Sequence, residues 1–169
     1  VCMSEPKEPA FFTKAEFPKG FSWYAQCFEH CGSKRVRGEF SCAYLRKRGC
    51  AALIHEHYPN AKLIVCLRHP IERLRSGYYY HYTKGANSSI DPVADLWPQN
   101  PNIANERSKS QYARLLSPYL ERFPREQLLV LIYEDIKADP QAFMSRVYEY
   151  LGVDPTFVPP SLTRKSNIT

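Results

Sequence analysis

The fold is decided by residues 62–82, which read Lys-Leu-Ile-Val-Cys-Leu-Arg-His-Pro-Ile-Glu-Arg-Leu-Arg-Ser-Gly-Tyr-Tyr-Tyr-His-Tyr. Residues 63–67 are an unbroken apolar run with β-branched members, too short for a helix and without the alternation of a half-exposed strand. This run predicts a buried strand of a parallel sheet. A helix should follow, because Pro70 suits a first helical turn and apolar residues recur behind it at helical spacing.

Arg68 stands where the predicted strand ends and just before the predicted helix begins. In open α/β sheets, ligands collect outside the carboxyl ends of the strands, where helix N-termini attract anions. The planar guanidinium of an Arg can bind two oxygens of one phosphate. The segment therefore predicts an anion site, although an Arg paired with a surface carboxylate would give the same pattern.

Strands and helices alternate along the whole chain. The apolar patterns predict strands at 10–13, 36–41, 63–67 and 128–133, and helices at 22–31, 46–57, 70–84, 108–123 and 139–151. Between them, the stretch rich in Pro, Asn and Ser at 86–107 is expected to be a loop that faces the substrate. No repeat or linker divides the sequence. We therefore predict a single α/β domain over residues 1–169, with three layers and a mostly parallel central sheet.

The composition fits a folded, basic domain. The 169 residues are 44% hydrophobic and carry a net charge of +6. Basic residues cluster at Lys34, Arg35 and Arg37, which favours an anionic partner, with a merely soluble basic surface as the alternative. No apolar stretch approaches the roughly 20 residues of a membrane span. No nucleic-acid recognition motif is present, so we expect no nucleic-acid partner.

The cysteines give no clear framework. Six are present, without a Cys-x-x-Cys pair, and Cys66 lies inside the predicted buried strand, so no disulfide pattern can be inferred. A helix would turn Cys27, His30 and Cys31 to one side as half of a metal site. No second Cys/His pair at zinc spacing follows, and no metal is expected.

Two segments resemble the nucleotide-binding part of a known family. Residues 67–78 are similar to the 3′-phosphate-binding segment of sulfotransferases that use 3′-phosphoadenosine 5′-phosphosulfate (PAPS). That segment has Leu-Arg-x-Pro and, eight residues after its Arg, a Ser, which Arg68 and Ser76 match. Residues 133–140, together with 150–153, resemble a later strand and helix of the same family.

A third set of matches indicates the branch. Residues 7–12, 20–24 and 39–44 are similar to the heparan-type and related carbohydrate sulfotransferases. The resemblance covers nearly the whole chain in the family's order. It implies a P-loop-NTPase-like sulfotransferase fold, truncated at both ends. It also implies transfer of a sulfuryl group from PAPS to a hydroxyl or amine of an acceptor, and it favours a carbohydrate as that acceptor.

The resemblance implies roles for individual residues. Glu8 would be the general base that takes the proton of the acceptor. Arg68 and Ser76 would hold the 3′-phosphate of PAPS, and Arg164 and Lys165 would begin a basic loop over the nucleotide. The acceptor channel is expected to be shaped by the long loop and by Lys34, Arg35 and Arg37.

The chain departs from the family at the 5′-phosphosulfate loop. This Lys-bearing Gly-Thr turn should stand some tens of residues before Glu8, where the sequence has only seven residues. Phe40 replaces a Lys of the heparan-type branch, and Ala10 stands where some relatives have His. We therefore expect a fragment with weak or no activity by itself. The alternative is a non-catalytic module that binds an anionic glycan or a nucleotide.

The compartment stays open at this point. The Golgi lumen, with an anchor in an N-terminal segment outside this sequence, and the cytoplasm both fit. Asn-x-Ser/Thr sequons at Asn87 and Asn167 tilt the balance only slightly toward a secretory route. The sequence predicts neither the identity of the acceptor nor the oligomeric state.

Overall fold

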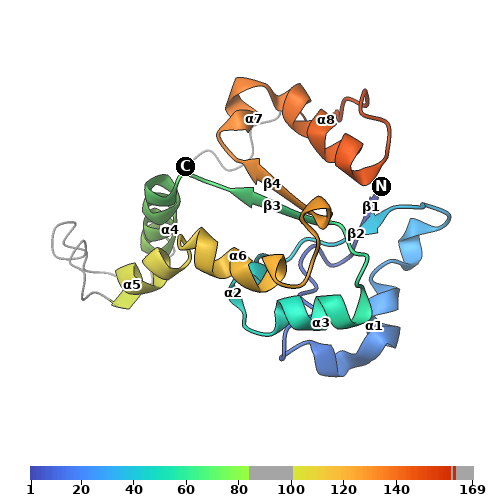
Figure 1. Ribbon diagram of the computed structural model, residues 1–169, viewed down its shortest axis with the longest axis horizontal. Helices are drawn as coiled ribbons and strands as arrows, with labels where there is room; N and C mark the ends of the chain where they lie inside the picture. Colours follow the sequence, from blue (N-terminus) through green and yellow to red (C-terminus); the bar gives the residue numbers. More distant parts are fainter. Residues whose placement is uncertain (84–100, 161, 163–169) are drawn as a thin grey trace.

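The computed structural model describes residues 1–83, 101–160 and 162, and its elements are labelled in Figure 1. Two pairs of parallel strands run through it. Strand β3 (Leu63–Leu67) pairs with β4 (Leu128–Ile132), and strand β1 (Cys2–Met3) pairs with β2 (Arg37–Gly38). Both pairings are parallel, as predicted, but within the described residues they form two separate sheets.

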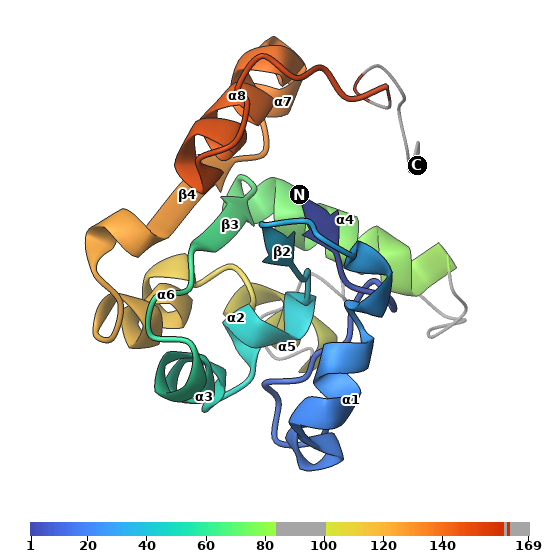
Figure 2. The same cartoon turned by 90° about the vertical axis from the view of Figure 1, so that its right-hand side faces the viewer.

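Helices cover the β3–β4 pair from two sides. Helices α7 (Asp135–Ala138) and α8 (Pro140–Leu151) lie on one side of it, and α3 (Cys50–His57) and α6 (Tyr112–Leu120) lie on the other (Figure 1 and Figure 2). The predicted α/β architecture with layered helices is therefore confirmed.

Strand β3 begins and ends where the sequence predicted, but it is not buried on both faces. Its side chains alternate between half-buried and exposed, with Ile64 42% exposed and Cys66 also open to solvent. Only the apolar run was visible in the sequence, and among the described residues no element covers these two side chains. Helix α4 (Pro70–Thr83) then starts at Pro70, as expected.

Besides Leu128 and Leu131 of β4, which are almost fully buried, a core cluster of buried side chains lies between helices. It joins the Phe11-Phe12 pair to α3 and α6, and Phe11 is fully buried. The ring of Phe11 stacks on Tyr24 at 4.4 Å between centroids. Burial of such aromatic side chains contributes about 1.5–3 kcal/mol each. Phe11 and Phe12, which follow Glu8 closely, are therefore anchored in this core. The buried members of this core are Phe11, Phe12, Ala51, Ile54, Tyr119 and Phe123.

The N-terminal half contains more and shorter elements than predicted. The expected strand at 10–13 is a turn, because Ala10 adopts a positive φ of 51° that no strand allows. The expected helix at 46–57 is divided, because Gly49 at φ 89° separates α2 (Cys42–Arg46) from α3. The expected helix at 22–31 is divided as well. Its segments are α1 (Gly20–Gln26) and η2 (Glu29–Cys31), and a short helix that was not predicted, η1 (Phe17–Lys19), precedes them.

The C-terminal half follows its local signals more closely. Asp139 caps α8 by accepting a hydrogen bond from the Ala142 amide at 2.9 Å, and Gly152 ends the helix at φ 72°, so α8 lies within the predicted range of 139–151. Helix α5 (Pro101–Ser108) forms inside the stretch predicted to be a loop, and η3 (Arg125–Gln127) precedes β4. Pro118 stays inside α6 without ending it.

In the described part of the chain, no helix is long and apolar enough to span a membrane.

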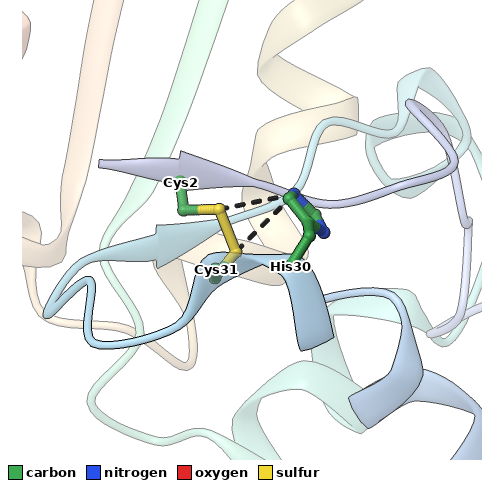
Figure 3. A group of neighbouring side chains, drawn as sticks. All are labelled: Cys2, His30 and Cys31. Carbon is green, nitrogen blue, oxygen red and sulfur yellow. Dashed lines mark hydrogen bonds between the residues drawn. A yellow bond between two sulfur atoms is a disulfide. The ribbon is translucent and has the colours of Figure 1, made fainter.

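One disulfide, which the sequence did not predict, ties the N-terminus to the rest of the chain. Cys2 of β1 is bonded to Cys31 of η2, with His30 beside both sulfur atoms (Figure 3). A separation of 29 residues leaves no local signal for such a bond. Cys27, His30 and Cys31 do not form the hypothetical half of a metal site, because the helix ends at Gln26. The Cys27 thiol donates a hydrogen bond to the Trp23 carbonyl instead.

Candidate functional site: acidic and basic side chains at the strand ends

Arg68 follows the last residue of β3 and is held from three sides. Its guanidinium lies 3.8 Å from a carboxylate oxygen of Glu72 and over the ring of Tyr133, 5.4 Å from the centroid. Its carbonyl accepts a 2.8 Å hydrogen bond from the Tyr112 hydroxyl. The side chain is 32% exposed, so it is placed by its neighbours and still reaches solvent. An Arg held in this way can receive an anion from outside.

The end of β4 supports the same corner. The backbone amide of His69 donates a 3.0 Å hydrogen bond to the Glu134 carboxylate. That hydrogen bond, helped by the charge of Arg68, holds the pKa of Glu134 below its usual range. Glu134 was not among the predicted site residues. Its position directly after the predicted apolar strand at 128–133 was the sequence signal that could have identified it.

Ser76 lies on α4, two turns beyond Arg68, and is exposed. Glu72 and Ser76 are four residues apart in one helix, so they share a side of it, and Glu72 reaches back to Arg68. The predicted pair of Arg68 and Ser76 is therefore compatible with one ligand lying along this side of α4.

A buried ion-pair network fixes α4 against α5. The Arg73 guanidinium contacts the Glu106 carboxylate at 3.0 Å and the Ser110 hydroxyl at 2.6 Å, and Lys109 also pairs with Glu106. Burial disfavours the charge of Glu106, but the bonds from Lys109 and Arg73 outweigh it and lower its pKa. Gly77 leaves the room for this contact, because a Cβ there would collide with the Glu106 carboxylate.

Glu8 lies on the loop after β1 and is exposed. Its carboxylate accepts a 3.4 Å hydrogen bond from the backbone amide of Cys42, the first residue of α2, and the Cys42 thiol lies 3.7 Å away. A carboxylate held by a backbone amide and still open to solvent can accept a proton from a bound acceptor.

The residue after β2 is a second acid, which we did not predict as a site residue. Glu39 follows β2, is half-buried, and accepts a short hydrogen bond from the Tyr44 hydroxyl. Burial raises the pKa of Glu39, and the tyrosine hydroxyls at Tyr44 and Tyr24 offset this only in part. The sequence signal was present, because Glu39 and Tyr44 belong to the 39–44 segment that resembled the heparan-type branch.

The other predicted site residues lie elsewhere. Lys34 and Arg35 line an open cavity of about 510 Å³. Its remaining lining residues are Val1, Ser33, Val36, Gly152 and Val153, so neither Glu8 nor Arg68 belongs to it. Arg37 donates a 2.8 Å hydrogen bond to the Gly32 carbonyl. Arg164 and Lys165 fall outside the described residues.

Paired parallel strands flanked by helices, with a half-exposed Arg after one strand and an amide-held carboxylate after the other, define an α/β domain with charged groups at one edge of its β3–β4 sheet. A model described as "Sulfotransferase family" matches residues 6–157, so the chain belongs to the sulfotransferase family. This match includes Glu8, Arg68 and Ser76. The family that the sequence resembled is thereby confirmed.

Curated relatives are named for heparan sulfate. The chain is 30% identical over 152 residues to heparan sulfate glucosamine 3-O-sulfotransferase 3B1 of Mus musculus, covering 86% of this chain and 38% of that protein. It is 24% identical over 165 residues to bifunctional heparan sulfate N-deacetylase/N-sulfotransferase 2 of Homo sapiens, covering 88% of this chain and 18% of that protein. The chain thus spans well under half the length of these relatives.

Solved structures agree on the fold. A sulfotransferase from Alicyclobacillus acidocaldarius superposes with a TM-score of 0.83 at 25% identity, covering 98% of this chain and 76% of that one. The sulfotransferase domain from the curacin biosynthetic pathway superposes with a TM-score of 0.60 at 18% identity, covering 86% of this chain and 48% of that one. The predicted α/β sulfotransferase fold is therefore confirmed.

Proposed function

We propose that this chain is part of an enzyme that transfers a sulfuryl group from PAPS to a hydroxyl or amine of a carbohydrate of the heparan sulfate class. One observation carries the proposal. The family match contains both Glu8 and Arg68, and each of these side chains stands after a parallel strand, held by neighbours and accessible to solvent. The two curated relatives described above, both named for heparan sulfate, suggest the acceptor.

Glu8 acts as the general base. As the acceptor oxygen or nitrogen forms its bond to the sulfur of PAPS, the proton of the acceptor passes to the Glu8 carboxylate. The bond between that sulfur and the phosphate oxygen breaks, and 3′,5′-ADP leaves. By analogy with phosphoryl transfer, such a transition state is loose, so alignment and charge stabilisation supply most of the rate.

Arg68 and Ser76 bind the 3′-phosphate of the donor. The donor groups fit that role, because a guanidinium forks onto two phosphate oxygens and a hydroxyl adds a third hydrogen bond. Glu72 stands beside Arg68 and is the group that a phosphate would displace. Recognition of this phosphate distinguishes PAPS from nucleotides that lack it.

Nucleotide binding tests this assignment in the chain as it is. Titration of 3′,5′-ADP and 5′-AMP should show a preference of at least tenfold for the 3′-phosphorylated nucleotide, since a charge-assisted hydrogen bond contributes roughly 1.5–3 kcal/mol. Arg68→Ala should abolish the preference. Arg75→Ala is the matched control, because Arg75 of α4 is exposed and also pairs with Glu72.

Equal affinity for the two nucleotides would contradict the phosphate site. The non-catalytic alternative, a module that binds an anionic glycan, draws its support from the separate basic cavity at Lys34 and Arg35. Under that alternative, heparin would bind with an affinity that falls with salt and is lost in Lys34→Ala/Arg35→Ala. Heparin would not compete with 3′,5′-ADP for binding.

We further infer an oxidising compartment such as the Golgi lumen rather than the cytoplasm. The disulfide between Cys2 and Cys31 supports it, because such bonds persist where thiols are not kept reduced. Mass spectrometry of the protein, alkylated inside its native cells before extraction, tests this inference. Alkylation of both cysteines would contradict it.

A further inference from the structure

Three hydrogen bonds dock the segment that carries Glu8 onto the corner between β2 and α2. We call residues 8–12 the Glu8 segment and residues 39–44 the corner. The Cys42 amide donates to Glu8 at 3.4 Å, the Ala10 amide donates to the Ser41 hydroxyl at 3.0 Å, and the Phe12 amide donates to the Tyr44 hydroxyl at 3.1 Å. These bonds recur at alternate residues along the segment. The first bond holds the Glu8 carboxylate itself, and the other two hold the backbone of the segment at Ala10 and Phe12.

The backbone of the Glu8 segment needs such support. Ala10 adopts φ 51°, the left-handed conformation that costs an L-residue free energy and persists only where its surroundings enforce it. On one side, Phe11 and Phe12 anchor the segment in the core. On the other side, the corner bonds at Glu8 and Ala10 hold the residues that lead into this turn.

Tyr44 is the central member of the corner. Its hydroxyl accepts from the Phe12 amide and donates to Glu39, so both of its hydrogen-bonding directions are used. Its ring also packs on Phe12, with centroids 5.9 Å apart. Glu39 thereby sets the orientation of the hydroxyl, because a carboxylate oxygen can only accept the hydroxyl proton.

We propose that Tyr44, oriented by Glu39, is a positioning residue that holds the Glu8 segment in the geometry needed for proton transfer. The proposal rests on the proposed function, in which Glu8 is the base. It assigns Glu39 a role as an acceptor for Tyr44 and not as a second base. Loss of the Tyr44 hydroxyl frees the Phe12 amide and lets Glu8 move relative to the acceptor.

Hydrogen exchange tests the docking without any need for catalysis. In the 169-residue chain, Tyr44→Phe should speed exchange of the Phe12 amide at least tenfold, with amides of the β3–β4 pair unchanged. Tyr58→Phe is the matched control, because the Tyr58 ring also contacts Phe12, at 5.7 Å between centroids. Unchanged exchange in Tyr44→Phe, or an equal change in Tyr58→Phe, would overturn the proposal. If Tyr44→Phe does not fold, Glu39→Leu is measured in the same way.

Turnover tests the consequence, in the protein expressed from its complete reading frame. Tyr44→Phe should lower kcat about 10- to 100-fold, the loss typical of a misplaced catalytic group, and leave KM for PAPS unchanged. Glu39→Gln, which keeps an acceptor for Tyr44, should retain a rate within about threefold of wild type, whereas Glu39→Leu should match Tyr44→Phe.

A double variant separates this proposal from the one on which it rests. In a Glu8→Gln background, Tyr44→Phe should cause no further loss, because both changes act through the same carboxylate. An additive loss, or a loss seen only in KM for PAPS, would overturn the positioning role. A full rate for Glu8→Gln alone would overturn the base assignment. An inactive Glu39→Gln would point to Glu39 as the base.

Discussion

Two carboxylates, the half-buried Glu39 and the buried Glu106, are held in opposite ways inside this domain. Glu106 is paired with Arg73 and Lys109 between α4 and α5, and its pKa is lowered. Glu39 accepts a hydrogen bond from the Tyr44 hydroxyl, and burial raises its pKa. Among the described residues, no cation lies within ion-pair distance of Glu39. The first carboxylate braces the helix behind the predicted phosphate site, whereas the second braces the segment with the predicted base.

The difference follows from what each contact must do. Arg73 and Lys109 are themselves largely buried, 20% and 18% exposed, so Glu106 is needed to neutralise them. Glu39 has no charge to neutralise and serves to orient Tyr44. Ion pairing thus stabilises the scaffold at α4, while a hydrogen bond without an ion pair sets geometry near Glu8.

The largest effect is expected when each carboxylate is removed. Glu106→Leu leaves two buried cations without a partner and should cost about 3–5 kcal/mol of unfolding free energy. Glu39→Leu loses one hydrogen bond from a tyrosine and should cost about 1–3 kcal/mol. Urea unfolding of both variants measures the difference, and equal costs would remove the distinction between the two sites.

Gly77 gives a smaller test of the same packing. Gly77→Ala drives a methyl group into the Glu106 carboxylate and should cost about 1–3 kcal/mol, since overpacking displaces the network. The neighbouring substitution Ser76→Ala is the control, because Ser76 is exposed and its change should leave stability within about 0.5 kcal/mol. A stable Gly77→Ala would mean that α5 is free to shift away from α4.

The two carboxylates should also give stability opposite dependences on pH. The lowered pKa of Glu106 contributes stability above its usual value of 4.5, and this is lost as the pH falls through the folded-state pKa. Glu39 has a raised pKa, so its contribution is present below 4.5 and is lost as the pH rises through the folded-state pKa.

Unfolding free energies measured from acid to neutral pH check these signs. As the pH falls, Glu106→Gln should lose less stability than wild type does. Relative to wild type, Glu39→Gln should be stabilised more at neutral pH than in acid. Curves that shift in the same direction for both variants would contradict the assigned environments.

The smallest effect concerns Glu72. Its carboxylate lies 3.8 Å from the guanidinium of Arg68, and an incoming phosphate must compete with it. Glu72→Gln should therefore tighten binding of 3′,5′-ADP by about two- to fivefold, within the range of an exposed ion pair. Calorimetry at low salt measures this. Weaker binding by Glu72→Gln would indicate that Glu72 orients Arg68 rather than competing with the ligand.

The elements that the sequence predicted well have strong local causes. Strands β3 and β4 come from unbroken apolar runs, and α8 has Asp139 at its start and Gly152 after its end. Arg68 was visible because a strand end and a proline frame it. The match to the sulfotransferase family came from motif order, which periodicity alone would not have supplied.

The elements that escaped prediction depend on distant contacts. Phe11 and Phe12 looked like a strand, yet the aromatic core and the positive φ of Ala10 make a turn of them. The disulfide joins residues 29 positions apart. Glu39 belongs to the 39–44 motif, but nothing in the sequence indicates that it is half-buried. Its connection to Phe12 through the Tyr44 hydroxyl arises only from the folding of the chain.

Sulfuryl transfer itself tests the central claim most directly. The protein expressed from its complete reading frame is supplied with radiolabelled PAPS and heparan sulfate, and wild type is compared with Glu8→Gln and with the surface control Glu56→Gln. We expect labelled heparan sulfate from wild type and the control, and at least a hundredfold less from Glu8→Gln, in line with the effect of removing a general base. Equal transfer by wild type and Glu8→Gln, or no transfer by any of the three, would contradict the account.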